Sequence, residues 1–266
     1  MRKIINFSLA IMFLFAVEVS AQTEIVPILN TKVNGLLGGI QNGKFVDAKT
    51  TFAQLKGKRS YGIYDTIQKI ATIEIEVQAP SEPCEDFYPL NYSLDDVEGI
   101  AIGTNPGWNL QPRAAKVIDL NNPAYIKAAS DALRTKGIIN KAPKIRDALR
   151  VDLEGDGQEE VLINVTSYGE GIQPRAKRGD YSFILLRKIV GGKVRNTIVT
   201  GDFVKKNIMF GAPSKFEISS IADLNGDGKL EVIIYGAYYE GHWIETYEMK
   251  DSKLADIKVL NVGCGV

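Results

Sequence analysis

The apolar residues of this chain recur with a period of two over long stretches, which predicts β-strands. In residues 70–77, three β-branched side chains alternate with polar ones. Residues 181–189 are apolar on both faces, and Gly191-Gly192 then predicts a tight hairpin turn. Three further apolar runs predict a meander near the end of the chain, over residues 231–239, 243–249 and 254–262. The chain should therefore be mainly β, with a few short helices.

One longer helix interrupts this pattern. Asn122 can cap its start, Pro123 suits the first helical position, and Gly137 can end it. Before this helix, the chain is rich in Pro, Asn, Asp and Gly from residue 80 onward. The pattern predicts a signal peptide (1–21), a small β-rich unit (22–80), a linker and helix (81–149), and two tandem β units (150–266, about 150–210 and 211–266).

The first 21 residues have the three parts of a secretory signal peptide. Arg2 and Lys3 form a basic start, residues 4–17 are mostly apolar, and small residues lead to a cleavage position near Ala21. The apolar stretch is shorter than the roughly 20 residues that span a bilayer. We therefore expect an exported protein, periplasmic or extracellular, without a membrane span in the mature chain. An uncleaved anchor is the alternative.

The charge of the chain bears on whether it binds nucleic acid, and its cysteines bear on whether it forms a disulfide. The chain has 32 basic and 32 acidic side chains, so it lacks the basic excess expected of a nucleic-acid-binding protein. Cys84 and Cys264 are its two cysteines. Export would place them where disulfides persist, so they could pair, and two separate thiols are the alternative.

An internal repeat occurs 71 residues apart in the second half of the chain. Residues 151–163 and 222–234 are identical at eight of thirteen positions, and an apolar run follows each aspartate-rich segment. Oxygen-bearing side chains occupy positions one, three, five and nine of each segment, and position seven can offer a carbonyl oxygen. The candidate metal ligands are Asp152, Glu154, Asp156, Gln158 and Glu160 in the first loop and Asp223, Asn225, Asp227, Lys229 and Glu231 in the second.

Hard oxygen ligands in a flexible loop favour Ca²⁺. Gly157 and Gly228, at position six, permit the sharp turn, and the converging carboxylates would repel one another without a cation. An EF-hand needs a glutamate at position twelve and flanking helices, whereas position twelve here is Ile163 or Ile234 in an apolar run. Two metal-free Asx-turns are the alternative to two calcium loops.

With these loops, the chain resembles the FG-GAP or VCBS repeats of integrin-type β-propellers and exported bacterial proteins that carry them. The resemblance covers roughly residues 100–266 and includes the terminal Gly263-Cys264-Gly265. It implies two tandem four-stranded units that are similar to propeller blades, each with calcium in a loop between strands. Only two loops are visible, whereas a closed propeller usually needs at least four blades.

The sequence contains no familiar catalytic motif. His242 is the one histidine, and no Gly-x-Ser-x-Gly, His-Glu-x-x-His or Walker motif is present. We therefore expect a non-enzymatic calcium-binding structural or binding module, with a protein or glycan as its unknown ligand. The alternatives are a secreted hydrolase that uses carboxylates outside the loops on a glycan or peptide polymer, and an oligomer or a subunit of an envelope assembly.

Aromatic residues are concentrated just after the second loop. They could form a platform for a glycan or peptide, with Trp108 and Arg113 joining it, or they could be ordinary β-sheet packing. The set consists of Tyr235, Tyr238, Tyr239, Trp243 and Tyr247.

Overall fold

The computed structural model describes residues 24–93, 97–103 and 106–265. This part of the chain is mainly β, as the sequence predicts. The expected signal peptide at residues 1–21 lies outside the described residues. None of the described helices has the length and apolar character needed to cross a membrane.

The amino-terminal part of the chain forms a seven-stranded sheet. Its strands are β1 (Val26–Asn30), β2 (Gly35–Gln41), β3 (Lys44–Val46), β4 (Arg59–Tyr64), β5 (Lys69–Val77), β6 (Leu90–Asn91) and β7 (Ile100–Gly103). They lie in the order β3-β2-β1-β7-β4-β5-β6, with antiparallel pairing throughout. The short helix α1 (Ala48–Phe52) begins after Asp47, whose carboxylate accepts a hydrogen bond from the Thr50 N–H at 2.8 Å.

Two of these strands lie in the segment expected to be a linker. β7 is a central strand, between β1 and β4, and β6 closes one edge of the sheet. Ile100, Ala101 and Ile102 are all buried because β7 is covered on both faces. This apolar run is too short to show a strand period, and polar residues surround it, which explains why the sequence pattern missed it.

The rest of the chain forms two antiparallel five-stranded sheets. The first contains β8 (Lys116–Val117), β9 (Ile145–Val151), β10 (Glu160–Thr166), β11 (Tyr181–Val190) and β12 (Lys193–Phe203). The second contains β13 (Lys215–Ala222), β14 (Glu231–Tyr238), β15 (Gly241–Lys250), β16 (Lys253–Asp256) and β17 (Val262–Gly265). Helix α2 (Pro123–Thr135) lies between β8 and β9 in the chain, and its Asn122 cap agrees with the prediction.

The two sheets have the same up-and-down plan. Strands β9 to β12 are neighbours in chain order, and β13 to β16 repeat that arrangement. β16 and β17 pair with opposite halves of β15, and a single 3-10 turn, η1 (Lys258–Leu260), separates them. The units therefore extend over residues 116–203 and 215–265, which differs from the predicted boundaries because β8 and β9 begin before residue 150.

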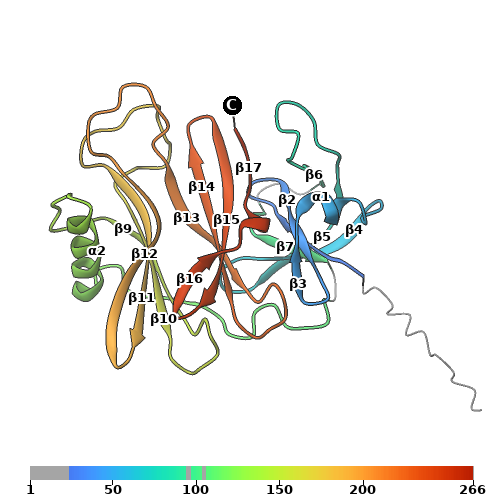
Figure 1. Ribbon diagram of the computed structural model, residues 1–266, viewed down its shortest axis with the longest axis horizontal. Coiled ribbons are helices and arrows are strands. Elements are labelled where there is room, and N and C mark those ends of the chain that lie inside the picture. Colours follow the sequence, from blue (N-terminus) through green and yellow to red (C-terminus); the bar gives the residue numbers. More distant parts are fainter. Residues whose placement is uncertain (1–23, 94–96, 104–105, 266) are drawn as a thin grey trace, which may run out of the picture.

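The three sheets and α2 are stacked in layers (Figure 1). One face of the second five-stranded sheet packs on the first, through residues such as Val232 and Leu162. Its other face packs on the seven-stranded sheet, where Ile233 meets Ile28. Helix α2 covers the outer face of the first sheet through Ala129 and neighbouring apolar side chains. The β13–β17 sheet is thus the middle layer, and both of its faces are buried.

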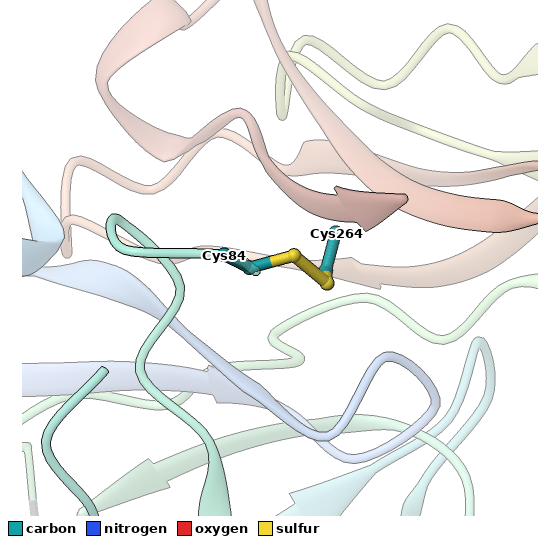
Figure 2. Close-up of a disulfide and its surroundings, with 2 residues drawn as sticks. All are labelled: Cys84 and Cys264. Carbon is teal, nitrogen blue, oxygen red and sulfur yellow. A yellow bond between two sulfur atoms is a disulfide. The ribbon is translucent and has the colours of Figure 1, made fainter. Parts of the chain in front are cut away.

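A disulfide joins Cys84, in a turn after β5, to Cys264 in β17 (Figure 2). The two Cα atoms are 5.7 Å apart, and 180 residues separate the cysteines in sequence. The bond therefore ties the last strand of the middle layer to the amino-terminal sheet.

Loss of this disulfide should lower the free energy of unfolding by about 3 kcal/mol, because the unfolded chain gains the entropy of a long open loop. We expect Cys84→Ser, Cys264→Ser and the double variant to reduce the melting temperature equally, since each removes the same bond. Thermal unfolding with and without reductant measures this. A wild-type melting temperature that reductant leaves unchanged, with thiol titration confirming reduction, would contradict the prediction.

Candidate functional site: two paired aspartate loops

The two aspartate-rich segments occupy equivalent hairpin connections. Residues 152–159 join β9 to β10, and residues 223–230 join β13 to β14. Both loops lead directly into buried strands, as the sequence predicts. Leu153 and Leu224, at position two of each loop, are fully buried and anchor the loop to the core. The loops therefore have fixed positions at one end of the two sheets.

In the first loop, the carboxylate of Asp152 organises the backbone. It accepts hydrogen bonds from the N–H groups of Gly155 at 2.7 Å and Gly157 at 2.9 Å. Asp156 accepts from the Gln158 N–H at 2.9 Å. Glu160 is 1% exposed and accepts from the Leu153 N–H at 2.9 Å. Each acidic residue at positions one, five and nine therefore supports the turn directly.

The second loop repeats this network. Asp223 accepts from Gly226 at 2.7 Å and Gly228 at 2.9 Å. Asn225 and Asp227 each accept from the backbone N–H two residues further on, at 3.0 Å and 2.8 Å. Glu231 accepts from the Leu224 N–H at 2.7 Å. Because a carboxylate has about four lone-pair sites, these bonds leave oxygen lone pairs on Asp223 and Glu231 for another ligand.

Each loop requires glycine at two positions, of which only position six was predicted from the sequence. Gly157 and Gly228, at position six, have φ of 83° and 84°. Gly155 and Gly226, at position four, have φ of 74° and 78°. Side chains other than glycine rarely adopt this left-handed conformation. The repeated Gly-x-Gly spacing was the available signal for the second position.

The first loop contains a cation supplied by the protein itself. The ammonium group of Lys188, from β11, forms ion pairs with Glu154 and, at 3.1 Å, with Glu160. Lys188 is only 6% exposed. Burial disfavours its charge, but the two glutamates outweigh this effect and raise the pKa of Lys188 above its usual value. The repeat does not indicate Lys188, because this residue lies outside it.

The second loop has a glutamate at the corresponding place. Val161 pairs with Arg187 and Val232 with Tyr247, so Lys188 and Glu248 hold the same position opposite Glu160 and Glu231. Glu231 is 1% exposed and has no ion-pair partner among the described residues. Burial, followed by the charges of Asp227, Asp223 and Glu248, raises the pKa of Glu231 to about 9. The second loop thus concentrates acidic groups where the first contains an ammonium group.

Two residues from the segment before α2 contact the loops, and one of them bridges both. Arg113 donates to the carbonyl oxygen of Asp152 at 2.6 Å and to that of Gly228 at 2.7 Å, so it joins the first loop to the second. The Trp108 indole N–H donates to the Asp223 carbonyl at 2.8 Å, and its ring lies against Gly226. The structure places both residues at the loops, whereas the sequence left open whether they join an aromatic surface.

The predicted metal ligands lie closer together in the second loop than in the first. Over the described residues, no three His, Cys, Asp or Glu side chains form a compact group able to hold a metal. Asp223 and Asp227 nevertheless lie close enough to Glu231 to raise its pKa. Glu154 turns to Lys188, and Gln158 and Lys229 are exposed. The second loop is therefore the better candidate for a cation.

The aromatic residues after the second loop divide between the core and the surface. Trp243 packs edge-to-face on Phe216 with ring centroids 5.8 Å apart, and Tyr247 is 8% exposed. These two belong to the contact between the five-stranded sheets. The other three predicted residues, Tyr235, Tyr238 and Tyr239, line a cleft. Ordinary β-sheet packing therefore accounts for Trp243 and Tyr247, but not for the three tyrosines that line the cleft.

Comparison with known proteins gives no assignment: no protein-family model, curated protein or solved structure matches this chain.

Proposed function

We propose that this protein is an exported, non-enzymatic binding module whose second aspartate loop holds one calcium ion that stabilises the fold. The observation that carries the proposal is the exchange of Lys188 for Glu248 at equivalent positions. One loop balances its buried glutamate with an ammonium group. The other presents additional acidic groups to its buried glutamate, and a bound cation would balance them.

The donor set of the second loop fits calcium. It consists of carboxylate and amide oxygens, together with the carbonyl of Lys229, and such hard ligands suit Ca²⁺ better than Zn²⁺ or Cu²⁺. Asp223, Asn225, Asp227 and Glu231 would hold the ion, and Glu248 would add negative charge beside it. When bound, calcium would neutralise the buried Glu231, whose raised pKa reflects the cost of its charge in isolation.

The first loop does not fit a second ion. Lys188 contacts both Glu154 and Glu160, and Arg113 lies 4.0 Å from the Asp152 carboxylate. A calcium ion there would be repelled by the Lys188 ammonium group and would have to displace it. We therefore propose one calcium ion per chain, in place of the two that the repeated spacing suggests.

The same repeat supports a blade-like architecture. Strands β9–β12 and β13–β16 are four-stranded antiparallel meanders, each with an aspartate loop between its first two strands. They pack face to face, as neighbouring blades would. We propose an open stack of two blade-like units, because α2 covers one end and the seven-stranded sheet covers the other.

Calcium titration tests the metal assignment. We expect isothermal titration calorimetry and elemental analysis to find one calcium ion per chain. Asp227→Ala should weaken binding at least tenfold, whereas Lys229→Ala should retain it, because position seven contributes only its backbone carbonyl. Two bound ions, none, or equal effects of the two substitutions would each contradict the assignment.

A further inference from the structure

A cleft opens where loops and strands of all three sheets converge. Its volume is about 380 Å³, within the usual range for small-molecule sites. Lys32 comes from the β1–β2 turn, Glu170 and Ile172 from the β10–β11 connection, and the other lining residues from β13, β14 and the turn after β14. Those are Lys215, Glu217, Tyr235, Ala237, Tyr238 and Tyr239.

The cleft and the second aspartate loop lie at opposite ends of the β13–β14 pair. Glu217 is in β13, and Asp223, six residues further on, directly follows the end of that strand at Ala222. At a rise of about 3.3 Å per residue, this places them roughly 20 Å apart. The cleft is therefore a separate site, and its chemistry can be tested independently of the calcium loop.

The charges in the cleft are already paired. Lys32 contacts Glu217 at 2.9 Å and Glu98 at 3.0 Å, and Lys215 contacts the other oxygen of Glu217 at 2.7 Å. The carboxylates would repel an anionic ligand such as a phosphate. The two ammonium groups would repel a cationic ligand, and Lys32 already lies 4.7 Å from the centre of the Tyr235 ring. An uncharged polar ligand suits this arrangement best.

A second acidic residue, on the neighbouring sheet, lies close to the cleft residue Glu217. Asp147 pairs with Asn164 as Glu217 pairs with Tyr235, so the two carboxylates hold corresponding positions in the repeated units. Asp147 is exposed, and partial desolvation together with the charge of Glu217 raises its pKa. The adjacent Asn164 is fully buried, and its amide lacks a hydrogen bond of normal geometry among the described residues. Asp147 therefore adds an exposed hydrogen-bond acceptor close to Glu217.

Aromatic rings form the other part of the cleft wall. Tyr238 and Tyr239 pack edge-to-face with centroids 5.9 Å apart, and Tyr239 is 42% exposed. Aromatic rings offer an apolar face with a polar tip, which suits ligands that present C–H groups and hydroxyls together. Sugar rings have this character: C–H groups stack on the aromatic face, and hydroxyls donate to carboxylates.

We propose that this cleft binds an uncharged glycan. The proposal rests on the protein's being a binding module, and it specifies the ligand class. Tyr239 supplies the exposed stacking surface, Glu217 accepts hydroxyl hydrogen bonds, and Lys32 and Lys215 hold that carboxylate in place.

The test uses neutral hexasaccharides of β-1,4-linked glucose, mannose, xylose and N-acetylglucosamine, and of α-1,4-linked glucose. Isothermal titration calorimetry on the full mature chain should detect binding of at least one. Tyr239→Ala should weaken that binding at least tenfold, whereas Tyr239→Phe should keep it within about threefold because the aromatic face remains. Val117→Ala, an exposed apolar position outside the cleft, serves as the control.

Absence of binding by every hexasaccharide would overturn the proposal, as would equal losses in Tyr239→Ala and Tyr239→Phe. Binding of trilysine at the cleft instead of a glycan would also overturn it.

Repeating the titration with Glu231→Gln separates the glycan proposal from the calcium proposal. If the glycan binds this variant and the wild type equally, but neither holds calcium, then the cleft assignment stands and the calcium assignment falls.

Discussion

Removing calcium should lower the melting temperature of this protein by about 10 °C. A ligand at a thousand times its dissociation constant stabilises the native state by about 4 kcal/mol. A change of 1 kcal/mol corresponds to roughly 2–4 °C for a chain of this size. The physical source is Glu231, which is 1% exposed and surrounded by Asp223, Asp227 and Glu248. Thermal unfolding in 1 mM calcium and in excess EDTA measures the difference.

Glu231→Gln provides the matched control for chelation. The amide keeps the shape of the side chain and can still accept from the Leu224 N–H, but it cannot become the negatively charged carboxylate that would bind calcium. We expect this variant to melt at nearly the same temperature with calcium and with EDTA. Wild-type protein that melts at one temperature in both conditions would contradict the calcium proposal, as would a Glu231→Gln variant with the full response.

The sequence predicts the local parts of this fold well. The Gly191-Gly192 hairpin, the helix that starts at Pro123 and the strands after both loops depend on turn chemistry and on short-range periodicity. Strand β7 was missed because its place in the sheet depends on partners far away in the chain, β1 and β4. The layered arrangement likewise results from contacts between sheets, which no local pattern encodes.

In the candidate site, too, the sequence predicts the local features but not the contacts made by residues far away in the chain. The repeat supplied the loop residues, and their spacing correctly indicated turns that lead into strands. It could not supply Lys188 or Glu248, which approach the loops from the next strand, or Arg113, which bridges them. These residues distinguish the two loops, so equivalence in sequence does not mean equivalence in charge. The strand register places Lys188 of β11 opposite Glu160 and Glu248 of β15 opposite Glu231, and this placement makes the charges of the two loops differ.

The stack of sheets explains how one ion could affect the whole molecule. The second loop belongs to the middle layer, whose two faces contribute to the cores shared with both neighbouring sheets. Leu224, beside Asp223, packs in the core shared with the seven-stranded sheet, and Arg113 ties Gly228 to the first loop. Distortion of this loop would therefore disturb both interfaces.

Exchanging the charges at positions 188 and 248 should exchange which loop binds calcium. Lys188→Met would leave Glu160, which is 1% exposed, without its ammonium partner. Breaking a buried ion pair by removing one partner costs about 3–5 kcal/mol, so the melting temperature should fall by roughly 10 °C or more. Lys188→Glu should destabilise the protein similarly in EDTA, but calcium should reverse much of that loss by binding to the first loop. Titration should then find two ions per chain.

The reciprocal change, Glu248→Lys, would place an ammonium group opposite Glu231. We expect this variant to bind no calcium and to melt at one temperature with calcium or EDTA, because the lysine would replace the ion. Thermal unfolding and calcium titration of both variants test the idea together. If Glu248→Lys still bound one ion, or if Lys188→Met were as stable as the wild type, the charge at this position would not control metal binding. Opposite outcomes in the two loops would trace their difference to one strand position, because the two loops share the backbone hydrogen bonds that the residues at positions one, five and nine accept from positions two, four, six and seven.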